Sequence, residues 1–231
     1  KRSKNMTLGV VLHGNGVYDG TEIHEAVLTL LAIAEAGHQY QCIAPNWEQH
    51  HVVNHLTGEE MEEKRNVLVE SARIARGDII DLAEAKAEDY DALVLPGGFG
   101  TAKNFTQWAF AGPEGEIKAP VRDFLRRAVE RGIPLAALCM SPTTLAKALE
   151  GTEFSPTLSV GSRTEASPYD IGAIAEGVSQ TGMQVVDKSI REVSVDEEYK
   201  IICAPCYMME ADILAVRKNI QTAIAELLKM L

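Results

Sequence analysis

Residues Leu8–Ala44 read LGVVLHGNGVYDGTEIHEAVLTLLAIAEAGHQYQCIA. The stretch opens with a continuous apolar run and closes with Gln39–Ala44, and both segments have the length and composition of strands. Between them, apolar residues recur at the i, i+3, i+4, i+7 spacing of an amphipathic helix, with Thr21 as its predicted N-cap and Gly37 at its end. A strand, a helix and a second strand in this order predict a βαβ unit and therefore a buried parallel sheet.

The same alternation continues to the C-terminus. Apolar strands are predicted at Ala92–Leu95 and Ile133–Cys139, with amphipathic helices near them. Val193–Val195 and Ile201–Ala204 enclose a polar turn, which predicts a β-hairpin near the C-terminus. The predicted fold class is α/β: a doubly wound, mostly parallel sheet with helices on both faces.

The composition indicates an acidic chain with one hydrophobic core. It has 231 residues, of which 46% are hydrophobic, and no Pro/Gly/Ser-rich linker divides it. We therefore expect a single domain over residues 6–231, with a polar tail at residues 1–5. The formal net charge of -11 repels phosphate backbones and anionic lipids, so we expect neither a nucleic-acid nor a membrane partner. No apolar run is long enough to span a bilayer.

The cysteines indicate a reducing compartment. Cys42, Cys139, Cys203 and Cys206 are too few for a disulfide scaffold. The C-A-P-C pair lacks a second pair of ligands, so we expect no metal site. The first residues lack an apolar signal-peptide core. We therefore expect a cytoplasmic protein, or one of the mitochondrial matrix if a targeting segment was removed.

Ligands of doubly wound sheets bind at the carboxyl ends of strands, which selects His13–Gly20, Pro96–Gly100 and Cys139–Pro142. Cys139 ends a strand and is followed at once by a helix. The N–H groups and dipole of the helix start favour a thiolate there. Most free cysteines are simply small buried hydrophobes, but the neighbouring motifs favour a functional thiol.

Two further groups could serve this thiol. Gly97 and Gly98 follow a strand, and their N–H groups could stabilise an oxyanion together with that of Met140, although two glycines also make an ordinary turn. Glu25 lies in the first turn of the first helix, where an acidic residue is commonly a dipole partner. If Glu25 faces Cys139, a thiolate would raise its pKa and hold it protonated.

Histidine supplies little support for a Cys–His dyad. All six histidines precede Cys139, and only His13, at the end of the first strand, is placed to approach it. Lone histidines are usually structural. Asn15, in the same Gly-rich segment, is a further auxiliary candidate. The third glycine of that segment is misplaced for a dinucleotide fingerprint, so no such cofactor is expected.

Four stretches resemble a known family: GVYDGTEIHE (Gly16–Glu25), NHLTGEEM (Asn54–Met61), RNVLVESARIARG (Arg65–Gly77) and PGGFGTAKN (Pro96–Asn104). They closely resemble the ElbB-type glyoxalase-like proteins of the PfpI / Parkinsonism-associated deglycase superfamily, which is related to class I glutamine amidotransferases. The resemblance implies a flavodoxin-like fold and a homodimer.

The resemblance also implies roles for site residues. It places the reactive thiol of a nucleophile elbow at Cys139 and the supporting carboxyl at Glu25, and it assigns the oxyanion glycines to Gly97 and Gly98. Ser162 stands at or near the position where many relatives carry a histidine. Amidotransfer and proteolysis need a base beside the nucleophile, so we expect neither unless His13 reaches the thiol.

Two functions remain open from the sequence. The first is a glyoxalase without metal or organic cofactor, which converts a 2-oxoaldehyde such as methylglyoxal or glyoxal to a 2-hydroxy acid through a hemithioacetal on Cys139. The second is a thiol redox sensor or small-molecule binding protein that uses the same Cys139–Glu25 pocket. Cys206 stands where the family often has a small residue, and we assign it no role from the sequence.

Overall fold

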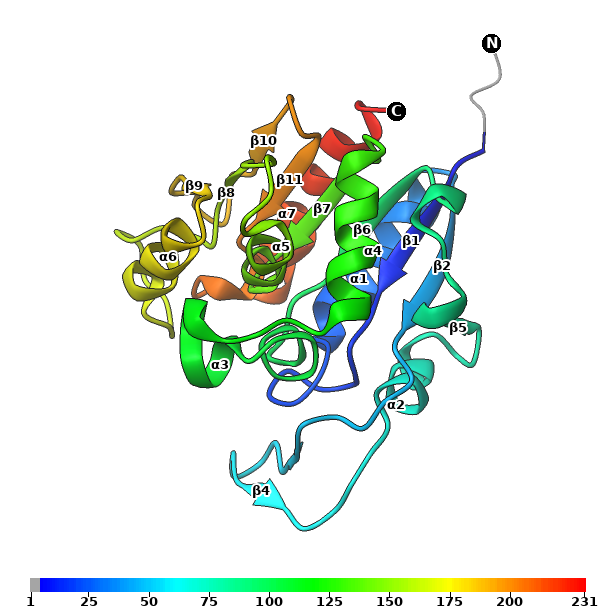
Figure 1. Ribbon diagram of the computed structural model, residues 1–231, viewed down its shortest axis with the longest axis vertical. Coiled ribbons are helices and arrows are strands. Elements are labelled where there is room, and N and C mark those ends of the chain that lie inside the picture. The colour runs from blue at the N-terminus through cyan, green and yellow to red at the C-terminus, as the bar shows by residue number, and fades with distance from the viewer. Residues whose placement is uncertain (1–4) are drawn as a thin grey trace.

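A seven-stranded sheet forms the centre of the protein (Figure 1). The computed structural model describes residues 5–231, so the expected tail at residues 1–5 lies outside the described residues except for Asn5. The strands of the sheet are β1 (Thr7–Val11), β2 (Gln39–Ala44), β5 (Ile79–Asp81), β6 (Ala92–Leu95), β7 (Leu135–Leu138), β10 (Ser194–Asp196) and β11 (Ile201–Ala204).

The strand order is β10-β11-β7-β6-β1-β2-β5. All neighbours are parallel except β10 and β11, which form the predicted antiparallel hairpin. From β1 the chain first adds β2 and β5 on one side and then β6, β7 and β11 on the other. The order therefore reverses between β1 and β6, which is where ligands bind in such sheets. The predicted doubly wound, flavodoxin-like α/β fold is confirmed.

Helices cover both faces of the sheet (Figure 1). α4 (Ala119–Glu130) and α5 (Ser141–Leu149) pack together on one face, and α1 (Ile23–Glu35) and α7 (Ile213–Leu228) pack together on the other. The remaining helices are α2 (Val67–Ile74), α3 (Trp108–Ala111) and α6 (Ile171–Gln180). The strands β6, β7 and β11 are completely apolar and buried, as the βαβ pattern predicts. Within residues 5–231, no helix combines the length and the apolar character needed to cross a bilayer.

The structure corrects the predicted start of α1. Its N-cap is Glu22, whose carboxylate accepts the N–H of Glu25 at 2.7 Å. Thr21 is not the cap because its hydroxyl accepts the N–H of His13 at 2.9 Å. This contact ties the end of β1 to the start of α1, so both sides of the Gly-rich loop are fixed before the helix begins.

Several elements were not predicted. After β6 the chain winds into a π-helical turn, Thr101–Phe105, a rare form that often occurs at functional sites. The irregular segment after β2 carries a two-residue pair, β3 (Val52–Val53) and β4 (Glu60–Met61), in an arm that extends from the sheet (Figure 1). A second small parallel pair joins β8 (Thr157–Leu158) to β9 (Gln184–Val185).

Candidate active site

Cys139 lies in the sharp turn between β7 and α5. Its φ is 58°, in the left-handed region that residues with a side chain rarely adopt. Its N–H donates to the carbonyl of Ala204 at 2.9 Å, so pairing with β11 holds the chain in place up to the turn. Pro142 occupies the first turn of α5, where no N–H is needed. The thiol is thereby fixed at the carboxyl end of the sheet.

Gly97 is the point where the Cys139 thiol and the Glu25 carboxyl meet. A Cβ atom built on Gly97 would lie 2.3 Å from Cys139 Cβ, 2.8 Å from Cys139 Sγ and 2.6 Å from Glu25 Oε1. Any side chain there would overlap both groups. The two functional groups therefore face each other across the space that the missing side chain leaves.

The Glu25 carboxyl is completely buried and accepts two backbone hydrogen bonds. Gly97 N–H donates to Oε1 at 2.9 Å, and Tyr207 N–H donates to Oε2 at 3.2 Å. Burial, reinforced by the nearby Glu22 carboxylate, raises the pKa of Glu25 to about 8. The direction is the predicted one, but burial is the main cause and a thiolate is not. At neutral pH most of the Glu25 carboxyl is protonated.

The expectation of a thiol with a lowered pKa is wrong. Burial and the facing Glu25 carboxylate raise the pKa of Cys139 well above its ordinary value. The N–H of Gly98 opposes this shift by contacting the sulfur, but it does not outweigh the loss of water. Only 5% of Cys139 is exposed. The loss of hydration therefore outweighs the stabilisation of a thiolate by the N-terminus of α5, and the resting thiol is protonated.

The backbone donors divide between two tasks. The N–H of Gly97 is committed to Glu25 and is not available to an oxyanion. Gly98, at φ 109°, directs its N–H to the sulfur, and a Cβ there would lie 2.4 Å from both Gly20 O and Glu22 N. Met140 is the N-cap of α5, where backbone N–H groups have no partner within the helix. Gly98 and Met140 are therefore the two candidate oxyanion donors.

The thiol opens into a small cavity of about 10 Å³, enough for roughly one water molecule. Apart from Cys139, its walls are Val17, Glu22, Gly98, Phe99, Met140, Tyr169, Tyr207 and Met208. The Tyr169 ring packs edge-on against Phe99, with centroids 5.7 Å apart. The Tyr207 hydroxyl is 2.8 Å from His24 Nδ1. A carbonyl substrate larger than water can enter only if one of these aromatic rings moves.

His13 is completely buried beside the Pro96–Gly98 turn. Its Nε2 is 3.1 Å from the carbonyl of Pro96, its ring packs edge-on against Phe105, and its Nδ1 has no hydrogen-bond partner within residues 5–231. Burial lowers the pKa of His13 to about 4, so the ring is neutral. Among the described residues, no hydrogen bond joins His13 to Cys139. A Cys–His dyad through His13 is therefore not formed.

The other auxiliary candidates lie away from the thiol. The Ser162 hydroxyl is 3.1 Å from the Thr164 hydroxyl and accepts the N–H groups of Thr164 and Glu165, so it organises its own turn. Asn15 is partly buried in the Gly-rich loop, and no side-chain hydrogen bond connects it to Cys139 in the described part of the chain. Neither residue contributes to the cavity wall.

The sequence analysis missed several residues of the site: Glu22, Tyr169, Tyr207 and above all Cys206. Cys206 is completely buried and, like Cys139, adopts a left-handed φ, 48°. It follows the end of β11, so the rule that selected the other strand ends would have selected it as well. Burial raises the pKa of the Cys206 thiol well above its ordinary value, and the backbone of Cys139 opposes that shift.

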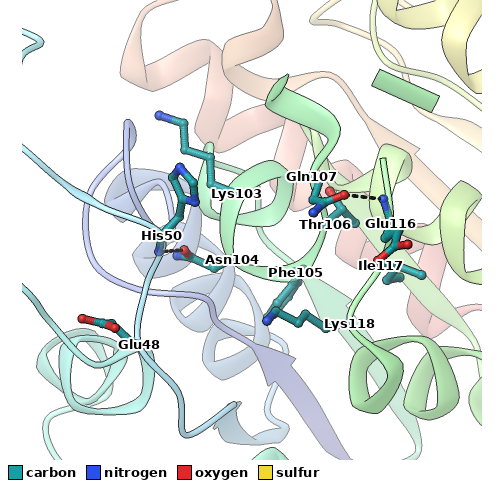
Figure 2. Close-up of a pocket in the computed structure, with 10 residues that line it drawn as sticks. All are labelled: Glu48, His50, Lys103, Asn104, Phe105, Thr106, Gln107, Glu116, Ile117 and Lys118. Atoms are coloured by element: carbon teal, nitrogen blue, oxygen red, sulfur yellow. Dashed lines mark hydrogen bonds between the residues drawn. The ribbon is translucent and has the colours of Figure 1, made fainter. Parts of the chain in front are cut away.

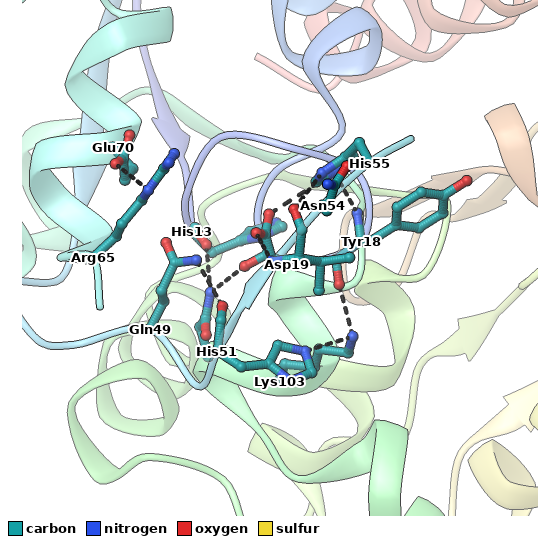
Figure 3. A network of polar contacts seen from close by, with 12 residues as sticks. His13, Tyr18, Asp19, Gln49, His51, Asn54, His55, Arg65, Glu70 and Lys103 are labelled. Carbon is teal, nitrogen blue, oxygen red and sulfur yellow. Dashed lines mark hydrogen bonds and ion pairs between the residues drawn. The ribbon is translucent and has the colours of Figure 1, made fainter. Parts of the chain in front are cut away.

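The arm between β2 and α2 fixes the outer side of the Gly-rich loop (Figure 3). Lys103, on the π-helical turn, donates to the carbonyl of Tyr18 at 2.7 Å and lies 2.9 Å from Nε2 of His51, on the arm. His55, also on the arm, accepts the N–H of Tyr18 at 3.2 Å and stacks on its ring. These contacts hold the loop that supplies Val17 to the thiol cavity.

A second cavity, of about 230 Å³, lies along the π-helical turn (Figure 2). It is lined by Glu48, His50, Lys103, Asn104, Phe105, Thr106, Gln107, Glu116, Ile117 and Lys118. The Asn104 amide donates to the carbonyls of His13 and Asp19 and accepts the N–H of His50. The cavity shares no residue with the one at Cys139, and it contains no thiol.

Relatives of known sequence share nearly the whole chain. It is 36% identical over 225 residues to the human "Glutamine amidotransferase-like class 1 domain-containing protein 3, mitochondrial", with 96% of this chain and 82% of the human protein covered. It is 28% identical over 213 residues to the zebrafish (Danio rerio) "ES1 protein, mitochondrial", with 90% of this chain and 79% of the zebrafish protein covered.

Solved structures agree with this relationship. An Ehrlichia chaffeensis isoprenoid biosynthesis protein with an amidotransferase-like domain superimposes with a TM-score of 0.87 and 31% identity, over 98% of this chain and 100% of that one. Drosophila melanogaster DJ-1beta shares the fold, with a TM-score of 0.57 and 20% identity, over 99% of this chain and 92% of that one. Residues 16–198 match the DJ-1/PfpI family. The chain therefore belongs to the DJ-1/PfpI family.

Proposed function

We propose that the protein is a cofactor-free glyoxalase that converts a 2-oxoaldehyde, such as methylglyoxal or glyoxal, to the corresponding 2-hydroxy acid. The observation that supports this most strongly is the pairing of Glu25 with Cys139 across Gly97. A carboxyl whose pKa is about 8 can both take and return a proton near neutral pH. Isomerisation of a 2-oxoaldehyde needs such a group beside a nucleophile.

The first step forms a hemithioacetal. Cys139 Sγ attacks the aldehyde carbon while the thiol proton passes to the ionised fraction of Glu25. This transfer lets a thiol with a raised pKa react without a resting thiolate. The negative charge that develops on the substrate oxygen is stabilised by the N–H groups of Gly98 and Met140. Glu25 then gives its proton to this oxygen, which completes the hemithioacetal and restores the carboxylate.

The second step moves a proton between adjacent carbons. Glu25 removes the proton from the former aldehyde carbon and returns it to the neighbouring carbon, which leaves a thioester of the 2-hydroxy acid on Cys139. Water then hydrolyses the thioester, releasing the acid and the free thiol. The net reaction consumes one water and needs no external oxidant or reductant.

The structure favours slow turnover. The thiol rests protonated, and the cavity of about 10 Å³ must enlarge to admit a 2-oxoaldehyde. A thiol redox sensor in the same pocket is the second candidate, because hydrogen peroxide is only slightly larger than the water molecule that the cavity fits. Amidotransferase and peptidase activities are not proposed, because no hydrogen bond joins a histidine to Cys139 in residues 5–231.

The decisive experiment measures lactate released from methylglyoxal. We expect release by the wild-type protein and none above background by Cys139→Ala. Cys203→Ala is the matched control, since Cys203 is also a completely buried thiol but lies within β11. Equal rates for the wild type and Cys139→Ala would end the glyoxalase proposal.

We also propose that the protein forms a homodimer. Ile23, Val27 and Leu31 are spaced four residues apart on α1, and each is at least 40% exposed. They form an apolar stripe on the side of α1 that faces solvent, beside α7. Such a stripe is typical of an interface between copies. Sedimentation of the wild type beside Val27→Asp would test this, with a monomer expected for the variant only.

The names of the human and zebrafish relatives place those proteins in mitochondria. For the present chain this favours the mitochondrial matrix over the cytoplasm among the two expected compartments. Fractionation of cells that express the full-length gene product would distinguish the two.

A further inference from the structure

Two thiols leave the sheet at neighbouring points of the same edge. Cys139 follows β7 and Cys206 follows β11, and these strands pair in parallel with Leu138 opposite Ala204. The N–H of Cys139 donates to the carbonyl of Ala204 at 2.9 Å, so the pairing continues into the Cys139 turn. Cys139 is therefore one position beyond the paired Leu138, and Cys206 is two positions beyond the paired Ala204.

The backbone of both cysteines is held in a sharp turn. Their φ angles are 58° and 48°, which only a minority of residues other than glycine adopt. The N–H of Cys206 donates to Asn219 Oδ1 at 2.9 Å, and the amide of Asn219 donates to the carbonyl of Glu192 at 2.9 Å. The Cys206 turn is thus anchored to α7, at the end of the strand that pairs with the strand preceding Cys139.

Neither of the other two cysteines is placed to react with the Cys139 thiol. Cys203 is within β11, where its thiol contacts Ser159 and Ser194. Cys42 is within β2, and β6 and β1 lie between β2 and β7 in the sheet. All four cysteines are free thiols. Cys206 is therefore the thiol that Cys139 can reach.

The two thiols differ in their access to solvent. Cys139 lines the small cavity and is 5% exposed, whereas Cys206 is 0% exposed and does not line it. A small oxidant therefore meets Cys139 first. Because the cavity holds roughly one water molecule, hydrogen peroxide fits it far better than a bulky organic hydroperoxide does.

We propose that Cys206 is the resolving partner of Cys139, and that hydrogen peroxide converts the pair to an intramolecular disulfide. In the first step the Cys139 sulfur attacks peroxide, the O–O bond breaks, and a sulfenic acid and one water form. In the second step the Cys206 sulfur attacks the Cys139 sulfur, the S–O bond breaks, and a second water leaves. Two thiols and one peroxide give one disulfide and two waters.

The disulfide has a distinct consequence for the thiol. A sulfenic acid without a partner is oxidised further to the sulfinic acid, which dithiols do not reduce. Capture by Cys206 stops the oxidation at a stage that a dithiol reverses. The inference rests on the reactivity of Cys139 with peroxide and not on aldehyde turnover, so it holds even if the glyoxalase proposal fails.

The test is mass spectrometry of the full chain after treatment with an equimolar amount of hydrogen peroxide and alkylation of the remaining thiols. We expect the wild type to lose the mass of two hydrogens and to yield a linked Cys139–Cys206 peptide that dithiothreitol separates. Cys203→Ala is the control and should form the same bridge. A Cys203–Cys206 link, or sulfinic acid at Cys139 beside an unmodified Cys206, would overturn the proposal.

A variant separates resolution from reactivity. In Cys206→Ser, which keeps the size of the side chain, we expect at least a tenfold increase in sulfinic acid at Cys139 over the wild type. Circular dichroism establishes that the variant is folded, and Cys206→Gly, which suits the left-handed φ, replaces it if it is not. An unchanged yield of sulfinic acid would contradict the proposed role of Cys206.

Discussion

Glu25 and His13 both contact the backbone of the Pro96–Gly98 turn, and both are completely buried. Each responds to burial by giving up its charge: the pKa of Glu25 rises to about 8, and the pKa of His13 falls to about 4. Their neighbours, however, differ. Glu25 faces the Cys139 thiol, whereas His13 faces the Pro96 carbonyl and the Phe105 ring. Burial sets the protonation state of both groups, but only the contact with a nucleophile gives one of them a chemical use.

The largest expected effect comes from replacing the two groups in turn. Glu25→Gln removes the carboxyl that faces the thiol across Gly97, so we expect kcat/KM for methylglyoxal to fall by about 10³-fold. His13→Gln should change it by less than about 10-fold, because the ring does not contact the thiol. Both values are measured per folded protein. If the His13 variant were as impaired as the Glu25 variant, the result would support a Cys–His dyad and contradict the contrast between the two residues.

The dependence of activity on pH sharpens the same comparison. The base is the Glu25 carboxylate, which exists only above its pKa, so kcat/KM should rise with pH and level off above about 8. His13 should contribute no step near the ordinary histidine value of 6.5, because its pKa lies at about 4. The measurement is a pH–rate profile from pH 5 to 9. A step near 6.5 that vanishes in His13→Gln would contradict the assignment.

An effect of comparable size is expected on the free energy of unfolding. The folded-state pKa of Glu25 lies above its ordinary value of 4.5, so its contribution is complete below pH 4.5 and is lost as the pH rises to about 8, by roughly 4 kcal/mol. The folded-state pKa of His13 lies below 6.5, so its contribution is complete above pH 6.5 and is lost towards about pH 4, by roughly 3 kcal/mol.

Urea unfolding between pH 4 and 8 would separate the two contributions. Glu25→Gln should flatten the loss of stability as the pH rises, and His13→Gln should flatten the loss as it falls. The opposite variant serves as the control in each limb. If Glu25→Gln becomes less stable between pH 5 and 8 as steeply as the wild type does, another group causes that slope.

The sequence was sufficient to predict the elements that position the site. The βαβ unit, the strand Ala92–Leu95 and the C-terminal hairpin follow from apolar runs and helical spacing, and they determine the order of the sheet. The strands β8 and β9 were missed because two residues each are too short to show a period. The N-cap of α1 was assigned to the wrong residue because a tertiary contact occupies the Thr21 hydroxyl.

The chemistry of the site was less accessible to sequence reasoning. The position of Cys139 before a helix is visible in the sequence, but the amount of protein that covers it is not, and that coverage decides the direction of its pKa. Tyr169 and Tyr207, which form part of the cavity wall, come from distant parts of the chain, so no local sequence pattern predicts their place in the site. Cys206, by contrast, lies at a strand end and was open to prediction.

Tyr207 contributes to the site through both its side chain and its backbone. Its ring forms part of the cavity wall, while its main-chain N–H is one of two backbone donors that favour the ionised form of Glu25. A guest that enters by rotating the ring alone leaves that donor in place. A ligand that displaces the whole of Tyr207 removes this N–H donor, so the pKa of Glu25 rises as the ligand binds. The way in which a molecule enters the cavity therefore determines the pKa of the Glu25 carboxyl that it meets.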